Sequence, residues 1–469
     1  HLVSEEGTNI IGAAFPGTPC ILTGANQYLG WTHTVNYPDK ADVYALQMHP
    51  KKKDVYLVDG KPYKLEKFKA KLTLKFLGIN IPIKKKFYKS IYGPTLKNKT
   101  GVYSVRTPST TNITAIEQWW KMNKATNFSE FYKVLEMKAL PGYNIGYADR
   151  NDTIFYISNG KIPIRAEGYD WLDVVPGNTR ETLWDSYYDI KDLPQVVKPA
   201  SGFVYNANHS PFKSSSEADN PIAENFAKEI NFETYDNNRS TRLLQLLEEE
   251  ERIDYKRFKR IKYDHQLPTP LQYNYMDLNP LFDMKVADYP EVSTLLNDIQ
   301  NWDRITNPTS YGAGAYASLY YQLTPFYYQL GKDRIFTKEA LYEALKITKD
   351  HLKTYFNAER IQLGEFQKLV RGNKELPIYG LPDVVTAMRG QPYKDGKIKI
   401  THGESYIELV KFTKNSTEIE SVISYGSSDH ESSEHYSDQM EMYSKFETKK
   451  MTFDKNDIYK NAKKIYHPN

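Results

Sequence analysis

Histidines 430 and 435 are the first residues in this sequence that suggest a specific chemistry, because a pair of nearby histidines can bind zinc. They lie five residues apart, whereas two ligands on one helix face need a spacing of three or four. The surrounding serines and aspartates favour a loop. We therefore treat a zinc-dependent hydrolase as a minor alternative. The sequence also has no G-x-S-x-G elbow, no P-loop and no G-x-G-x-x-G motif.

Four other patterns of polar and aromatic residues stand out along the chain. They are GWTHTVN at residues 30–36, GFVYNANHSP at 202–211, RSTRL at 239–243, and YGSS at 425–428 followed by EHYSDQ at 434–439. A Ser-His-Asp triad stays open, because its members need not be close in the sequence. No nucleophile can be recognised from these patterns alone.

Composition indicates a globular protein with a large core. The chain has 469 residues, of which 40% are hydrophobic, 14% aromatic and 26% charged. Its formal net charge of +4, from 62 basic and 58 acidic residues, is too small to predict nucleic-acid binding. No apolar run approaches the roughly 18 residues of a membrane-spanning helix.

The first residue and the single cysteine limit what the chain can be. Residue 1 is His, and no signal-peptide pattern follows it, so we expect a processed product or a fragment. Because Cys20 is the only cysteine, the chain can form neither an intramolecular disulfide nor a thiol-based zinc cluster. We expect it to be a small buried hydrophobic residue.

Strand patterns occur near both ends of the chain, with helices between them. We expect strands at 9–15, 20–23, 29–36, 41–49, 55–58, 61–64, 68–76, 397–401, 406–411 and 420–425. Helices are expected at 114–122, 127–140, 239–250, 291–302, 313–328, 338–356 and 455–466, the second with a capping box at Ser129. Residues 160–236 are rich in turn signals and predict long ordered loops. This order predicts an α+β fold with one large core.

Two lysine clusters, at residues 51–53 and 84–86, offer a choice of interpretation. They would suit an anionic partner, but we interpret them as the solvated ends of hairpins.

Taken together, the four patterns resemble the penicillin acylase family of N-terminal-nucleophile hydrolases, in order and over essentially the whole chain. The chain resembles the larger (β) subunit. The resemblance implies a four-layer αββα sandwich with a helical insertion. It predicts a first core part at 1–265, a mainly helical insertion at 266–395, and strands and a helix at 396–469 that complete the core.

The resemblance also implies a mechanism and a missing part. In this family an N-terminal Ser, freed by self-cleavage, is the nucleophile, and its α-amine is the general base. This chain begins with His1, so the serine would lie upstream and the chain by itself is expected to be inactive. The resemblance further implies a separate α subunit and a small-molecule acyl-amide substrate. It also implies a periplasmic or secreted location.

Three residues match the family's active-site groups. Val35 matches the residue whose backbone N–H helps to form the oxyanion hole, and Asn208 matches the side-chain donor. Arg239 matches the arginine that orients the nucleophile's amine and the active-site asparagine. Without the resemblance, Val35 reads as a buried strand residue, Asn208 as a left-handed turn residue and Arg239 as a helix surface residue.

A structural Ca²⁺ site is the cofactor that the resemblance implies. Asp39, the Ala41 carbonyl and Asp42 match one group of ligands, and Asp219 matches another. The alternative is that these are solvated loop aspartates.

We therefore interpret the chain as part of an amidohydrolase that cleaves linear amides of the penicillin or N-acyl-homoserine-lactone type. Residues 31–35 (WTHTV) look closer to the acyl-homoserine-lactone branch. The alternative function is a non-catalytic extracytoplasmic binding protein on an acylase scaffold.

Overall fold

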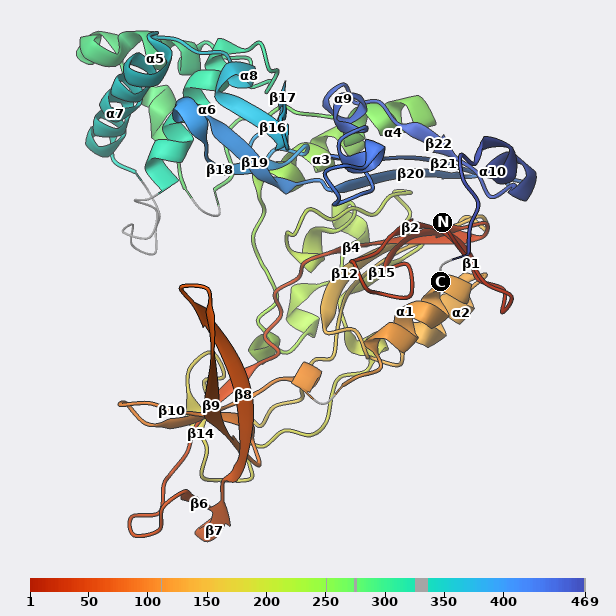
Figure 1. The fold of residues 1–469 in the computed structure, drawn as a ribbon, viewed down its shortest axis with the longest axis vertical. Coiled ribbons are helices and arrows are strands. Elements are labelled where there is room, and N and C mark those ends of the chain that lie inside the picture. Colours follow the sequence, from red (N-terminus) through yellow and green to blue (C-terminus); the bar gives the residue numbers. More distant parts are fainter. Residues whose placement is uncertain (111, 250, 274–275, 325–335, 468–469) are drawn as a thin grey trace.

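The computed structural model describes residues 1–469 except 111, 250, 274–275, 325–335 and 468–469. Helices and sheets from both ends of the chain are stacked in layers (Figure 1). Among the described residues, no helix is both long and apolar enough to cross a membrane.

The central layer is a seven-stranded antiparallel sheet. Its order is β1 (Leu2–Val3), β2 (Asn9–Ala13), β3 (Thr23–Asn26), β4 (Leu29–Thr34), β12 (Gly142–Asp149), β13 (Ile154–Gly160) and β15 (Gln195–Val197). Strand β13 is buried along almost its whole length, as expected for a strand covered on both faces. The sheet places β4, which carries Val35 just beyond its end, directly beside β12.

Two helices cover one face of this sheet (Figure 1). The apolar sides of α1 (Ala115–Lys124) and α2 (Phe128–Leu135) pack Trp119 and Phe131 against Trp31 and Phe155. Helix α2 begins two residues earlier than a cap at Ser129 would allow. Its N-cap is Asn127, whose side chain accepts the Glu130 N–H at 3.0 Å.

The opposite face of the sheet packs on a second sheet layer made by the end of the chain. Strands β20 (Tyr406–Phe412), β21 (Thr417–Ile423) and β22 (Lys449–Met451) form a three-stranded antiparallel sheet. Ile419 of β21 packs against Ile11 and Ala25. Helices α3 (Asn238–Glu248), α4 (Tyr255–Lys262) and α9 (Met440–Ser444) lie beyond this layer (Figure 1). The layer order is αββα, as the family resemblance implied.

The middle of the chain adds a helical part with its own core. Helices α5 (Ser293–Gln300), α6 (Tyr311–Leu323), α7 (Lys338–Phe356) and α8 (Leu363–Phe366) bury Leu296, Leu319 and Leu345 together. The expected end of the helix 313–328 lies outside the described residues. A four-stranded sheet follows, in the order β17 (Lys374–Pro377), β16 (Gln367–Arg371), β19 (Ile398–Gly403) and β18 (Met388–Pro392). Strands β16, β17 and β18 fall within residues 266–395, which were expected to form a mainly helical insertion. The division of the chain at residues 265 and 395 stays a prediction.

A second large sheet extends from the sandwich. Its order is β14 (Val175–Pro176), β5 (Asp42–Ala45), β11 (Val102–Arg106), β10 (Gly93–Lys97), β9 (Ile79–Ser90) and β8 (Glu66–Phe76), with β6 (Val55–Val58) and β7 (Lys61–Lys64) as a separate hairpin. Tyr44, Tyr92 and Trp184 belong to its core. Lys84, Lys85 and Lys86 are exposed, but they lie inside β9 and not at its end.

Several predicted elements have different bounds. The pattern at 20–23 predicted a strand, but β3 begins only at Thr23, and the Cys20 side chain packs in the core as a free thiol. The final helix, α10 (Lys455–Asn461), is shorter than 455–466. Residues 160–236 are mostly loops, as expected, joined by short 3-10 helices, β14 and β15.

Candidate active site

Val35 and Asn208 lie side by side although 173 positions separate them in the sequence. Asn208 has φ of 60°, the left-handed conformation that asparagine tolerates better than most residues. Its side-chain Nδ2 donates to the Val35 carbonyl at 2.9 Å. An amide nitrogen carries two N–H groups, so a second one remains for a ligand oxygen. Val35 is 51% exposed, which contradicts the alternative reading as a buried strand residue.

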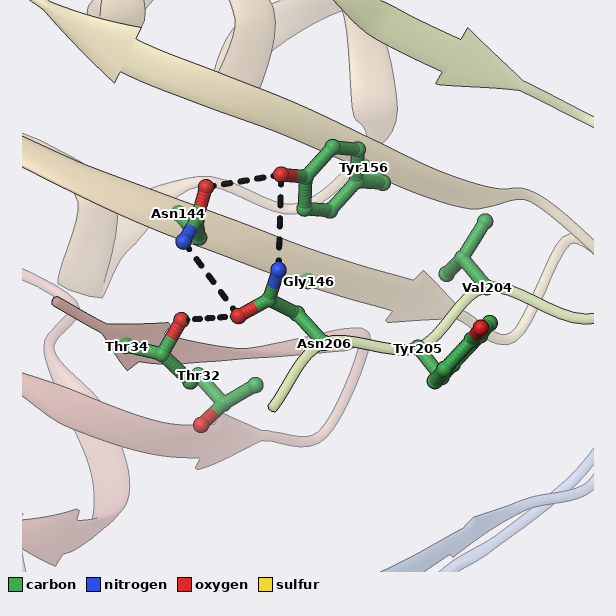
Figure 2. A pocket seen from close by; sticks show the side chains of 8 residues that line it. All are labelled: Thr32, Thr34, Asn144, Gly146, Tyr156, Val204, Tyr205 and Asn206. Carbon is green, nitrogen blue, oxygen red and sulfur yellow. Dashed lines mark hydrogen bonds between the residues drawn. The ribbon is translucent and has the colours of Figure 1, made fainter. Parts of the chain in front are cut away.

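Asn206 joins Asn208 to the central sheet, and Figure 2 shows its contacts with Thr34 and Asn144. Its Oδ1 accepts from the Thr34 hydroxyl, from Asn144 Nδ2 at 3.2 Å and from the Asn208 backbone N–H at 2.8 Å. The last of these bonds is an Asx turn, which fixes the left-handed residue that follows. The backbone at Asn208 is therefore held by groups from β4 and β12.

A buried tyrosine completes the network (Figure 2). The Tyr156 hydroxyl donates to Asn144 Oδ1 at 2.7 Å and lies 3.5 Å from Asn206 Nδ2. Asn144 also donates to the Val35 carbonyl at 3.2 Å. Asn144 and Tyr156 are 2% and 1% exposed, so their polar groups need these partners. The residues line a small cavity of about 80 Å³.

Arg239 orients the Asn208 side chain. It lies in the first turn of α3, whose N-cap Asn237 accepts the Ser240 N–H at 2.9 Å. An Arg239 terminal nitrogen, NH1, donates to Asn208 Oδ1 at 3.0 Å. Because the arginine binds the oxygen of the amide, the nitrogen must point the other way, toward Val35.

Asp383 in turn fixes Arg239. Its carboxylate accepts from Arg239 Nε at 3.1 Å and from the Asn238 N–H and Nδ2 at 2.9 Å each. Burial raises the pKa of Asp383 although Arg239 and Asn238 act to lower it. Asp383 also has a positive φ of 66°. The aspartate follows Arg239 by 144 positions, so no local spacing in the sequence could pair them.

His209 is part of the scaffold and not of the reacting groups. It is fully buried; its Nδ1 accepts from the Ala207 N–H at 3.1 Å and its Nε2 contacts the Lys213 carbonyl at 2.8 Å. Burial lowers the pKa of His209 to about 4. The ring is therefore neutral and fixes the loop between Asn206 and Asn208.

The predicted calcium ligands do not come together in one site. Asp39 and Asp42 both face the guanidinium of Arg165, at 3.2 and 3.1 Å. Asp219 instead accepts from the Ala200 and Ser201 N–H groups at 2.9 Å each. In the part of the chain that the structure describes, no group of three or more His, Cys, Asp or Glu residues is arranged to hold a metal. Asp39 and Asp42 are thus paired with an arginine and Asp219 with backbone N–H groups, and the calcium site stays a prediction.

The two histidines of the zinc alternative are surface residues that bind separate partners. His430 is 85% exposed and lies 3.7 Å from Asp429. His435 Nδ1 contacts Asp438 at 2.8 Å, in and after a short 3-10 helix (Glu434–Tyr436).

Comparisons with known proteins show the family of the chain. The sequence model described as penicillin amidase matches residues 1–460. The chain belongs to the penicillin amidase family. A solved structure with the same fold is the thermostable penicillin G acylase from Alcaligenes faecalis, with a TM-score of 0.66 and 16% identity over 99% of this chain and 92% of the other.

Curated members of the penicillin amidase family also match. The acyl-homoserine lactone acylase PvdQ of Pseudomonas fluorescens Pf0-1 is 24% identical over 95% of this chain. The penicillin G acylase of Escherichia coli is 27% identical over 47% of this chain and 25% of its own length. The chain spans 63% of the length of the Pseudomonas relative.

The site predicts that Asp383→Asn destabilises the fold and loosens Arg239. Asparagine tolerates the positive φ but carries no charge to pair with Arg239. We expect the free energy of unfolding, measured with denaturant, to fall by about 1–3 kcal/mol. The control is Asp152→Asn, which changes an exposed aspartate of φ 57° in the β12–β13 turn and should have almost no effect. Equal effects of the two variants would show that the Asp383 contact contributes nothing.

His209 predicts a pH dependence of stability. Its folded pKa of about 4 lies below the ordinary value of 6.5, so the unfolded chain binds the proton more readily between these values. The contribution of His209 to the free energy of unfolding should be fully present above about pH 6.5. It should be lost as the pH falls toward 4, at up to about 1.4 kcal/mol per pH unit. His209→Gln should flatten this slope in denaturant unfolding, and the exposed-site control His430→Gln should not. An unchanged slope in His209→Gln would contradict the assignment.

Proposed function

We propose that this chain is the larger part of an enzyme that hydrolyses the amide bond of N-acyl compounds. The nucleophile would be the N-terminal serine of the mature β subunit, outside residues 1–469. The serine hydroxyl attacks the amide carbonyl while its own α-amine takes the proton. Return of that proton to the departing nitrogen leaves an acyl-enzyme, which water then hydrolyses.

The contact of Asn208 with Val35 and Arg239 is the observation that carries this proposal. In acyl transfer, negative charge develops on the carbonyl oxygen only in the transition state. Donors that are already fixed stabilise this charge without reorganisation. Asn208 Nδ2 has its orientation set by Arg239 at 3.0 Å and has an N–H to spare, while Val35 lies beside it. We assign the two donors of the oxyanion hole to Asn208 Nδ2 and the Val35 backbone N–H.

The substrate class is inferred from the relatives. Their printed names are acyl-homoserine lactone acylase and penicillin G acylase, both enzymes named for removing an acyl group. We propose an N-acyl amide with an apolar acyl group. We put the acyl-homoserine-lactone type first, because the relative of that name matches over 95% of this chain.

Maturation, partner and location follow from the same proposal. Self-cleavage of a precursor would release the serine, and an α subunit from that precursor would supply the rest of the substrate pocket. Such an enzyme would act in the periplasm or outside the cell.

The proposal predicts that removal of the Asn208 amide lowers turnover with the fold intact. Glycine accepts a φ of 60° without strain, so Asn208→Gly removes the donor and keeps the backbone. We expect kcat of the full-length protein to fall about 100–1,000-fold in an assay of acyl-amide hydrolysis. The matched control is Asn357→Gly, at the end of α7, where φ is 49°.

Two results would count against this function. Equal turnover of Asn208→Gly and the unmodified protein would remove Asn208 from the oxyanion hole. A full-length protein that stays uncut and inactive toward every acyl amide, yet binds one of them, would favour the non-catalytic binding protein.

A further inference from the structure

Arg165 occupies the space between the two aspartates that were predicted to bind calcium. It follows β13 in the loop that leads away from the sheet, and its side chain is completely buried. Its Nε lies 3.1 Å from Asp42 Oδ2, and one terminal nitrogen, NH2, lies 3.2 Å from Asp39 Oδ2. The guanidinium is thus shared by two carboxylates three positions apart.

The remaining donors of Arg165 bind backbone carbonyls. NH2 donates to the Asp39 carbonyl at 3.2 Å, and NH1 donates to the Glu229 carbonyl at 3.1 Å. Two carboxylates and two carbonyls therefore surround one positive group. Such a set of oxygens is typical of a hard cation site. Here a side chain supplies the charge.

Removing this charge would leave the aspartates uncompensated. Asp42 is 1% exposed, and its Oδ1 has no hydrogen-bond partner among the described residues. Its Oδ2 accepts from Trp184 Nε1 at 2.6 Å in addition to Arg165. A buried charge that loses its partner is strongly destabilising, because desolvation is no longer offset.

The Arg165 cluster also joins two segments that lead to the candidate active site. The Asp39 N–H donates to the Ile230 carbonyl at 2.7 Å, and the Tyr37 N–H donates to the Glu233 carboxylate. Residues 37–42 are thus bound to residues 229–233. Val35 lies two residues before the first segment, and the second leads through Asn237 into α3 and Arg239.

We propose that Arg165 replaces the structural cation in this chain and is a positioning residue for the oxyanion hole. It fixes the segment after Val35 against the segment before Arg239, so that Val35 and Asn208 keep their separation. The protein would then need no calcium for stability. The positioning role rests on the proposed function, whereas the replacement of the cation can be tested without any activity.

The test compares thermal unfolding of the full-length protein and of Arg165→Ala, each with millimolar CaCl₂ or with a chelator. The unmodified protein should unfold at the same temperature in both. Arg165→Ala should unfold about 5–15 °C lower in chelator. CaCl₂ should raise the unfolding temperature of this variant part of the way back, because the two carboxylates and two carbonyls that bound Arg165 can bind Ca²⁺. MgCl₂ should not raise it.

Arg106→Ala is the matched control. Arg106 lies near the same cluster but donates to the neutral carbonyls of Trp184 and Ile91, and its guanidinium packs on the Trp184 ring at 4.5 Å. Removing Arg106 leaves no carboxylate without a partner. The unfolding temperature of Arg106→Ala should therefore fall less than that of Arg165→Ala, and it should not respond to calcium. Calcium stabilisation of the unmodified protein, or no calcium response in Arg165→Ala, would overturn the replacement of the cation.

A double variant keeps the proposal testable if Arg165→Ala does not fold. The double variant Asp42→Asn/Arg165→Ala removes the buried Asp42 charge together with its partner. It should unfold at a higher temperature than Arg165→Ala, or fold where Arg165→Ala does not. No gain from the second substitution would show that the charge of Arg165 is not what Asp42 requires.

The positioning role is tested separately, by measuring how far a variant of Arg165 changes kcat and how far it changes KM. Arg165→Lys keeps the charge but loses the planar fork that bridges Asp39 and Asp42. We expect a protein that folds without calcium and binds substrate with nearly unchanged KM, but with kcat at least tenfold lower. Unchanged kcat in Arg165→Lys would contradict the positioning role and leave the cation result standing.

Discussion

One side-chain oxygen, Asn206 Oδ1, sets the geometry on which the candidate site depends. It accepts from Thr34 at the end of β4, from Asn144 on β12 and from the backbone N–H of Asn208. A single acceptor thereby joins two strands of the central sheet to a loop about 60 positions further along. Since Asn144 is buried and the other groups are partly buried, breaking any of these bonds would leave a polar group poorly satisfied, at a cost of up to about 1–3 kcal/mol.

Charge fixes the same site from a second direction. Asp383 comes from the segment between β17 and β18, and it binds Arg239, which binds the Asn208 oxygen. Arg165 joins the segments that flank the site to each other. The αββα layers bring these segments together, because both ends of the chain contribute to the stacked sheets. The site is thus built by neutral hydrogen bonds on one side and ion pairs on the other.

The sequence predicted the parts of this molecule that local patterns determine. Helix α7 was predicted with its observed bounds because its apolar periodicity is long and Thr337 caps it. Strands β6 and β7 were predicted with their observed bounds, and the Asp59-Gly60 turn between them has the two positive φ angles of a tight hairpin turn. The αββα fold came from the family resemblance. The resemblance also singled out Val35, Asn208 and Arg239, and in the structure Asn208 contacts each of the other two.

Other features could not be predicted because they depend on distant partners. Asn144, Tyr156 and Asp383 are separated from Asn208 by at least 52 positions, and none has a distinctive neighbourhood in the sequence. The predicted calcium site also depends on groups far apart in the sequence, and it stays a prediction. Asp39 and Asp42 have suitable spacing for a metal, but the charged group that contacts both of them is Arg165, 123 positions after Asp42. Strands β16 to β18 were missed because short strands of mixed polarity carry little periodicity.

The most direct test of the account is a crystal structure of the mature full-length protein with a phosphonate inhibitor bound covalently to its nucleophile. The phosphonyl oxygen mimics the oxyanion of the tetrahedral intermediate. The account predicts that this oxygen lies about 2.7–3.1 Å from both the Val35 backbone nitrogen and Asn208 Nδ2, with Arg239 still bound to Asn208 Oδ1. A phosphonyl oxygen bound by other donors, with Asn208 still turned to the Val35 carbonyl, would contradict it.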